Sequence, residues 1–162
     1  MSDGNDRHDV IVIGGGLSGL ASAVLAAEAG RSVCVLEAHT KPGGRIRSVF
    51  DEHTGAFVAD LGPSWVWPTF QPVIGRWLAK LDLETVPQFD AGETVLDYGV
   101  DQPAQTGFIP GQEGNERVVG GSQALVDALV AKLPGGTVVA STAVTSVEDT
   151  GQGVLVRAGG EV

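Results

Sequence analysis

The chain has 162 residues, which matches one ordinary domain able to bury about 70% of its extended-chain surface. Apolar residues make up 43% of it and glycine occurs 24 times, a composition typical of a soluble α/β protein with many tight turns. The net charge is −10, from 20 acidic and 10 basic residues. This excess argues against a surface for nucleic acid or for an anionic membrane.

The segment before Asp9 is polar and acidic, so it lacks the basic stretch with which a secretory signal begins. The apolar residues that follow are interrupted by glycines and by Glu28, which argues against a membrane span. We therefore expect a cytoplasmic protein with no membrane partner. Cys34 is the one cysteine, so no intrachain disulfide can form, and its place in an apolar run predicts a buried, inert thiol.

A strand followed by a glycine-rich turn opens the main motif of the chain. Val10–Ile13 is an unbroken apolar run that predicts a strand covered on both faces of a parallel sheet. The pattern G-x-G-x-x-G follows at once, formed by Gly14, Gly16 and Gly19. In such a turn the first glycine allows the tight bend, the second lets the backbone approach a pyrophosphate, and the third lets the helix pack on the strand. The pattern predicts a dinucleotide-binding turn.

The residues after the turn complete the same unit. Residues 17–29 are rich in Ala and Leu and predict a helix that Gly30 ends, with its N-terminus directed at the phosphates. Val33–Leu36 predicts a second strand, and it is followed by Glu37, 18 residues after Gly19. A dinucleotide fold needs a carboxylate there for the ribose hydroxyls. Because an acid repels a 2′-phosphate, NADP is disfavoured, which leaves FAD and NAD open.

A second glycine pair comes just after this acid, in the sequence Lys41-Pro42-Gly43-Gly44-Arg45. With this segment the chain resembles the flavin-containing amine oxidase family and its relatives, the phytoene desaturases and protoporphyrinogen oxidases. In that group the GGR segment lies along the FAD, with its arginine near the phosphates. The resemblance therefore implies FAD as the cofactor. The contacts that it implies in this part of the chain are Gly14, Gly15, Gly16, Leu17, Ser18, Gly19, Glu37, Ala38, Gly43, Gly44 and Arg45.

The segment DLGPSW, which begins at Asp60, carries a glycine, a proline and the first of two nearby tryptophans. Glycine and proline predict a loop with exposed backbone, whereas Trp65 and Trp67 could simply be core residues. The segment resembles the part of the family that lies against the flavin ring. The resemblance thus implies contacts on the isoalloxazine side from Gly62, Pro63, Ser64 and Trp65.

The middle of the chain predicts a helix over residues 71–81, with Pro72 at its start, and strand-like pieces over residues 94–98. Residues 82–116 contain eight acids and no Lys or Arg. We interpret this run as a solvated acidic face, although it could also concentrate a cationic amine substrate. In the resembled family this region begins the substrate domain.

The last part of the chain predicts a return to the nucleotide domain. Ser122 is a candidate N-cap for a helix that ends at Leu133, and residues 137–140 predict a third buried strand. Residues 142–148 and 154–157 predict successive strands of a meander. By resemblance Val144 supplies a backbone contact to the adenine.

Other chemistries find no support in the sequence. The three histidines are scattered and are not paired with the cysteine, so no metal site is predicted. Neither Ser18 nor Ser122 completes G-x-S-x-G, which argues against a hydrolase nucleophile.

Together these features predict an α/β fold: a Rossmann-like FAD-binding domain with a parallel sheet and a β-meander, incomplete, with the start of a substrate domain. Residues 1–70 are interpreted as the first part of the FAD-binding domain and residues 71–116 as the start of the substrate-binding domain. Residues 117–162 continue the FAD-binding domain. The chain stops at Gly159-Gly160-Glu161-Val162, a turn followed by the first residues of what should be a further strand.

The resemblance implies the FAD-binding N-terminal part or subunit of a flavin-dependent amine or amino-acid oxidase, acting on a small-molecule amine. It covers nearly the whole chain but only about the front third of the family's pattern. The family's active-site lysine, aromatic cage and late FAD-binding segment have no counterpart here, so no catalytic residue is assigned. We expect a complementary polypeptide to complete the fold, or a longer gene. The alternatives are a desaturase-like or porphyrinogen-oxidase-like flavoprotein and a non-catalytic nucleotide-binding fragment.

Overall fold

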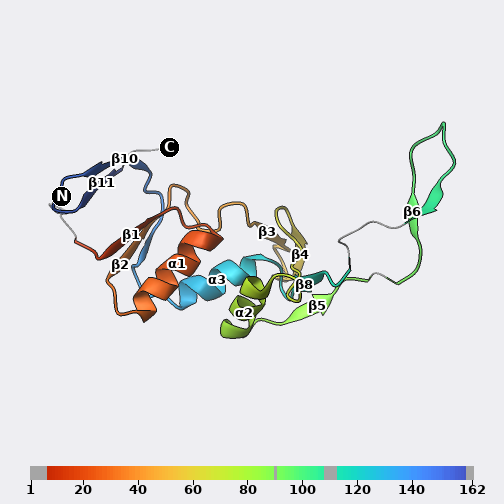
Figure 1. The fold of residues 1–162 in the computed structure, drawn as a ribbon, viewed down its shortest axis with the longest axis horizontal. Helices are drawn as coiled ribbons and strands as arrows, with labels where there is room; N and C mark the ends of the chain where they lie inside the picture. The colour runs from red at the N-terminus through yellow and green to blue at the C-terminus, as the bar shows by residue number, and fades with distance from the viewer. Residues whose placement is uncertain (1–6, 90, 108–112, 160–162) are drawn as a thin grey trace. The chain divides into compact units, whose positions relative to one another are not determined.

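The computed structural model describes residues 7–89, 91–107 and 113–159, which are drawn as ribbon in Figure 1. The chain divides into two compact units. The first comprises the residues up to Ser64 and those from Gly120 onward, and the second is Trp65–Val119. The predicted substrate-domain segment, residues 71–116, falls within the second unit.

The first unit is built on a parallel sheet of three strands in the order β1-β2-β9. These strands are Val10–Ile13, Val33–Leu36 and Val138–Val139. In the register of the sheet Val12 lies beside Val35, which in turn lies beside Val138. The prediction of a parallel α/β sheet is confirmed, and the third strand is shorter than the predicted residues 137–140.

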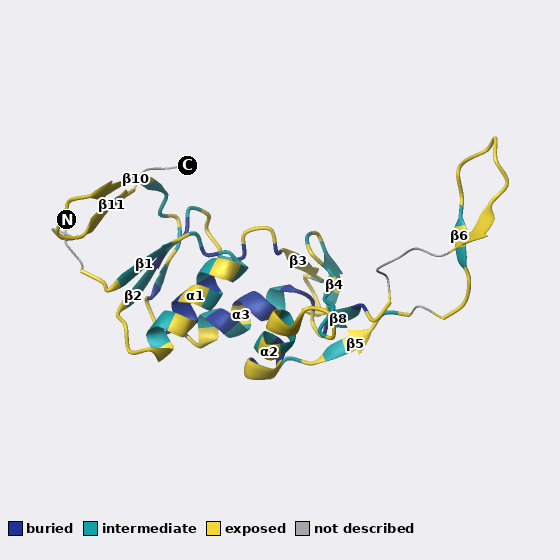
Figure 2. Ribbon diagram, in the orientation of Figure 1, coloured by how far each residue is buried: buried dark blue, intermediate teal, exposed yellow. Residues whose placement is uncertain are grey.

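Two helices supply the core of this unit. Helix α1 is Leu17–Glu28 and helix α3 is Gln123–Ala131, and they lie side by side (Figure 1). Helix α1 also packs against β1 and β2. The side chains that fill this core are apolar and at least nine-tenths buried, as the dark blue segments of Figure 2 show. They are Leu20, Ala23, Val24, Val35, Ile46, Leu125, Val126, Leu129 and Leu133.

Gly30 ends α1 as predicted. Its φ of +75° is in the left-handed region, and its N–H donates to the carbonyl of Ala27 at 2.9 Å. The N–H of Arg31 donates to the carbonyl of Ala26 at 3.0 Å. This pair of hydrogen bonds is the Schellman motif, which satisfies the last carbonyls of the helix.

The prediction that β1 and β2 are fully covered is wrong for the described residues. Most of their side chains are half-buried, including Cys34, and Ile13 is 53% exposed. Helix α1 is the helix that packs against both strands, so within the described residues one helix layer protects them. The thiol of Cys34 is therefore less buried than the sequence predicts.

Two antiparallel hairpins complete the first unit. The predicted meander strands are β10, Val144–Asp149, and β11, Val154–Ala158, which pair with each other. The hairpin of β3, Ser48–Phe50, and β4, Phe57–Asp60, was not predicted. The predicted final strand after Gly159 lies outside the described residues.

The second unit contains helix α2, Pro72–Lys80, at the predicted place. Its strands form two antiparallel pairs, β5 with β8 and β6 with β7. Their bounds are Thr85–Pro87, Glu116–Val118, Thr94–Leu96 and Gln105–Gly107. The buried apolar side chains of this unit are Leu78, Leu81 and Val118.

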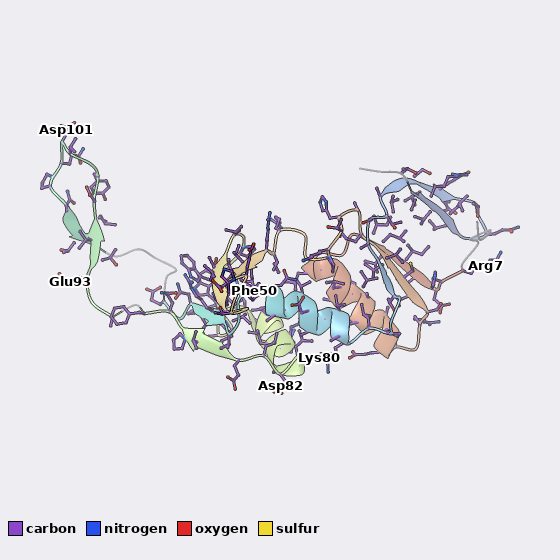
Figure 3. The ribbon with its side chains drawn as sticks, turned by 180° about the vertical axis from the view of Figure 1, so that it is seen from behind. Arg7, Phe50, Lys80, Asp82, Glu93 and Asp101 are labelled. Carbon is purple, nitrogen blue, oxygen red and sulfur yellow. The ribbon has the colours of Figure 1, made fainter. Side chains whose placement is uncertain are left out.

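The described acidic residues of the run 82–116 are all exposed, except for the half-buried Glu116. Figure 3 labels three of its carboxylates, Asp82, Glu93 and Asp101, and the last lies at the tip of the β6–β7 hairpin. Asp90 lies outside the described residues. This exposure favours the interpretation as a solvated face. No helix within the described residues combines the length and the apolar character needed to cross a lipid bilayer.

Candidate dinucleotide site

The glycine turn bends directly from β1 into α1. Gly14 adopts φ +95°, which L side chains rarely adopt, and its N–H donates to the carbonyl of Leu36 in the neighbouring strand at 2.8 Å. A Cβ on Gly19 would lie 2.1 Å from the carbonyl oxygen of Gly14. The first and third glycines are therefore required by the fold itself, for the bend and for the close approach of helix and strand.

Gly16 differs from these two glycines because a Cβ there would meet no atom within 4 Å. Its φ of −72° is accessible to any residue. It is the N-cap of α1, and α1 has no side-chain cap and no acid in its first turn. The space beside Gly16 is therefore open at an uncapped, positive helix end, an arrangement that fits a diphosphate.

Glu37 is buried, with 5% of its surface exposed. One carboxylate oxygen accepts the N–H of Gly15 at 2.6 Å, and the other accepts the N–H of His39 at 2.8 Å. An ionised carboxylate offers about four acceptor positions, so two remain for ribose hydroxyls. Glu37 thus fits the role predicted for it and also holds the glycine turn, which the sequence did not reveal.

The backbone of Glu37 is hydrogen-bonded to the third strand and to the segment that leads into the meander. Glu37 donates its N–H to the carbonyl of Val139, and its own carbonyl accepts the N–H of Thr142 at 2.8 Å. Ala38 is half-buried next to it. Val144, at the start of β10, follows Thr142 by two residues, so the predicted adenine contact lies close along the chain to this hydrogen bond.

The second glycine pair packs backbone to backbone on the first. Gly43 donates its N–H to the carbonyl of Gly15 at 2.9 Å, and a Cβ on Gly44 would lie 3.4 Å from the Cα of Gly16. Both Gly43 and Gly44 have positive φ, +133° and +60°. Arg45, the next residue, is exposed.

The predicted flavin-ring loop is attached to the GGR segment. A Cβ on Gly62 would lie 2.0 Å from the carbonyl oxygen of Arg45, and the N–H of Leu61 donates to the carbonyl of Arg47 at 2.8 Å. The hydroxyl of Ser64 donates to the carbonyl of Gly62 at 3.2 Å. Phosphate turn, GGR segment and residues 62–64 are therefore connected through backbone contacts.

Trp65, predicted with this loop, falls in the second unit. The residue is 42% exposed, and its ring meets that of Trp67 edge to face at 6.5 Å between centroids. The guanidinium carbon of Arg117 lies 6.0 Å from the ring centroid, in a cation–π contact. Trp65 therefore has partners of its own unit, and its predicted contact with the flavin stays a prediction.

The sequence prediction of Ser122 as an N-cap is right in position but wrong in its hydrogen bond. Ser122 precedes α3, yet its backbone is in the αR region and its hydroxyl does not cap the helix. The hydroxyl is 2.6 Å from the carbonyl oxygen of Pro63 instead. The cap comes from Ser48, whose hydroxyl oxygen accepts the N–H of Gln123 at 3.0 Å.

Asp60 was missed as a site residue. Its carboxylate accepts the N–H of Ser122 at 3.0 Å and the hydroxyl of Ser48. The one available signal was its position at the start of DLGPSW, directly before the loop that it supports. Among the described residues no group of His, Cys, Asp and Glu is arranged to hold a metal ion.

Comparison with known proteins agrees with this geometry. The family model of the NAD(P)-binding Rossmann-like domain matches residues 12–81. The chain is 39% identical over 111 residues to the flavin-containing amine oxidase A of Bos taurus. The aligned residues make up 67% of this chain and 20% of that protein. It is 42% identical over 81 residues to the flavin-containing amine oxidase B of Mus musculus, covering 50% of this chain and 15% of the relative.

A solved structure of wild-type putrescine oxidase bound to putrescine shares the fold. It superposes with a TM-score of 0.79 over 95% of this chain and 55% of that one, at 19% identity. The chain spans about one fifth of the length of the curated relatives it matches. The sequence likeness identifies the chain with the N-terminal portion of the flavin-containing amine oxidases, and the structural likeness shows the shared fold.

Proposed function

We propose that the chain binds FAD along the path from Gly14 to Ser64 and forms the FAD-binding part of a flavin-dependent amine or amino-acid oxidase. The observation that carries the proposal is the open space at Gly16, beside an uncapped helix N-terminus and a buried acid, Glu37. The relatives from Bos taurus and Mus musculus are named flavin-containing amine oxidases, which supports the choice of flavin.

The residues of the chain divide the work of binding. The first N–H groups of α1 would hold the diphosphate, and the guanidinium of the exposed Arg45 would add a positive charge beside it. Glu37 would accept hydrogen bonds from the adenosine ribose. Residues 62–64, with their backbone against Arg45, would lie on the ring side. When bound, the flavin would supply the redox chemistry, accepting a hydride from the amine-bearing carbon of the substrate.

The substrate is proposed as a small amine or amino acid. The putrescine bound in the related structure is an amine, which supports this class. We also propose that a complementary polypeptide completes the sheet and supplies the catalytic residues, in a cytoplasmic protein. The exposure of Ile13 and Val139, 53% and 40%, supports a missing cover. Co-expression with the downstream polypeptide should yield a flavin-containing, peroxide-releasing complex, and a chain that oxidises amines unaided would contradict this.

The substitution Gly16→Val tests the cofactor site. A Cβ at this position meets no protein atom within 4 Å and the backbone conformation is open to any residue, so we expect the variant to fold like the parent chain, with the same circular dichroism. Its side chain would occupy the space of the diphosphate, so bound flavin should fall below detection. Gly153→Val, in the turn of the β10–β11 hairpin and equally open, is the matched control and should keep its flavin. A folded Gly16→Val protein with normal flavin stoichiometry would show that the phosphate site is elsewhere.

A further inference from the structure

Pro63 is attached to the molecule through a single hydrogen-bonding group. Proline has no N–H, so its carbonyl oxygen is the only backbone group able to form a hydrogen bond. That oxygen lies 2.6 Å from the hydroxyl of Ser122, a residue 59 positions later in the chain. The pyrrolidine ring of Pro63 is exposed, so its outer surface is available to a planar ligand.

The hydroxyl of Ser122 is oriented by its surroundings. Ser122 is buried, with 6% of its surface exposed. Its hydroxyl has one proton and two acceptors nearby, the Pro63 carbonyl at 2.6 Å and Asp60 Oδ2 at 3.3 Å. The shorter contact receives the proton. The N–H of Ser122 donates to Asp60 Oδ1 at 3.0 Å, and this bond fixes the backbone from which the hydroxyl reaches Pro63.

Asp60 is held in place in turn. Ser48 donates its hydroxyl to Asp60 and accepts the N–H of Gln123, so both serines and the carboxylate are satisfied at the start of α3. A negative charge is favourable at a helix N-terminus. The network therefore links α3 to one side of residues 62–64, while the close approach of Gly62 to the Arg45 carbonyl fixes the other side.

We propose that Asp60 and Ser122 are positioning residues for the flavin ring. They fix the position of the Pro63 backbone relative to α3, and the isoalloxazine lies against this loop. This inference rests on the proposed FAD site. Removing the Ser122 hydroxyl would release Pro63 while leaving the glycine turn, Glu37 and the GGR segment intact. The change should weaken the binding of the ring half of FAD and leave the binding of the ADP half unaffected.

The test compares Ser122→Ala with its parent in binding FAD and binding ADP, the part of FAD without the ring. One lost hydrogen bond of ordinary strength predicts about a tenfold weaker FAD affinity. It also predicts a changed circular dichroism of the bound flavin between 350 and 500 nm, roughly the range of flavin absorption. ADP affinity should stay within about twofold of the parent, and Ser122→Thr, which keeps the hydroxyl, should restore the flavin signal.

The control is Ser22→Ala, which removes a serine hydroxyl that donates to a carbonyl, that of Ser18, at 2.9 Å in α1. It should change neither affinity nor spectrum. If Ser122→Ala fails to fold, Asp60→Asn replaces it, and the same contrast between FAD and ADP is expected. Equal losses for FAD and ADP, or no change in either, would overturn the inference. A parent chain that binds ADP but not FAD would overturn the proposed function itself, which is a different result.

Discussion

Two loop regions of the first unit are held in place by different kinds of contact. The phosphate turn and the GGR segment are held by backbone contacts, through Gly14 to Leu36 and Gly43 to Gly15. The positive φ of Gly14 and Gly43 and the close packing of Gly19 also exclude a side chain at these three positions. The loop of residues 62–64 is held on its α3 side by hydroxyl and carboxylate groups. Backbone contacts leave a motif in the sequence, whereas a side-chain network leaves scattered serines and an acid.

The largest expected effect is on the backbone-held part. In Gly19→Ala the new methyl group would lie 2.1 Å from the Gly14 carbonyl, and neither β1 nor α1 can move without losing its packing. We expect the free energy of unfolding to fall by about 3 kcal/mol or more. Gly153→Ala, where a Cβ meets nothing within 4 Å, is the control. Urea unfolding of both variants measures the difference, and a Gly19→Ala chain as stable as the control would contradict the structure.

Glu37 shows that the backbone-held part also depends on one side chain. Glu37→Ala should weaken FAD binding and also leave the N–H groups of Gly15 and His39 without an acceptor, which costs stability. Glu37→Gln keeps one acceptor oxygen and loses the charge. We expect FAD affinity to fall by about 2 kcal/mol in Glu37→Gln, with a smaller loss of stability than in Glu37→Ala. Flavin titration beside thermal unfolding separates the two effects, and unchanged affinity in both variants would exclude Glu37 as a ribose ligand.

Substitutions in the part held by side chains should lower the stability by smaller amounts. Ser48→Ala removes the acceptor for the N–H of Gln123 and a donor to Asp60. Losing a cap of this kind costs about 1 kcal/mol of stability, and we expect that loss here. Hydrogen exchange should rise in the first turn of α3 and stay unchanged in α1. If the substitution changes the exchange rates of α3 no more than those of α1, the network does not hold α3.

The smallest effect concerns an exposed side-chain link at the start of β1. Asp9 accepts the N–H and the hydroxyl of Ser32 at 2.8 and 2.9 Å. The backbone N–H of Ser32 first, and then its hydroxyl, lower the pKa of the Asp9 carboxyl below its ordinary value. Because the folded pKa is lowered, the stabilisation is complete above the ordinary pKa and is lost as the pH falls through the folded one.

We therefore expect Asp9→Asn to be slightly less stable than its parent at neutral pH, with the two stabilities converging in acid. NMR titration of the Asp9 carboxyl gives its pKa directly. A midpoint at or above the ordinary aspartate value would show that the link to Ser32 is not formed in solution.

The sequence predicted the parts of the fold that local patterns specify. The strands Val10–Ile13 and Val33–Leu36 have the predicted bounds, and the helix between them begins at the predicted residue and ends one residue earlier, at Glu28. These elements could be predicted because the glycine turn and the apolar runs act within a few residues. The β3–β4 hairpin was missed because its strands are short, and its turn depends on Asp51, which accepts the N–H groups of His53 and Thr54.

The site could be predicted only in part for the same reason. Gly14–Gly19 and Glu37 come together through neighbouring strands, so spacing alone indicates them. Asp60 and Ser122 are 62 positions apart, and no spacing rule links an acid to a serine at that distance. The hydrogen bonds that Glu37 accepts from Gly15 and His39 were hidden as well, because a sequence does not show which N–H groups a carboxylate will accept.

The pairing of β2 with the distant strand β9 has a consequence for the synthesis of the protein. Val35 and Leu36 of β2 pair with Val138 and Val139 of β9, so this strand pair joins residues about one hundred positions apart. At the usual rate of about 5–20 residues per second, some 5–20 s of synthesis separate the two strands on the ribosome. During that interval the β9-facing edge of β2 lacks the strand that pairs with it in the folded chain. Such edges invite pairing between nascent chains, so a chaperone that shields β2 should raise the yield of folded protein.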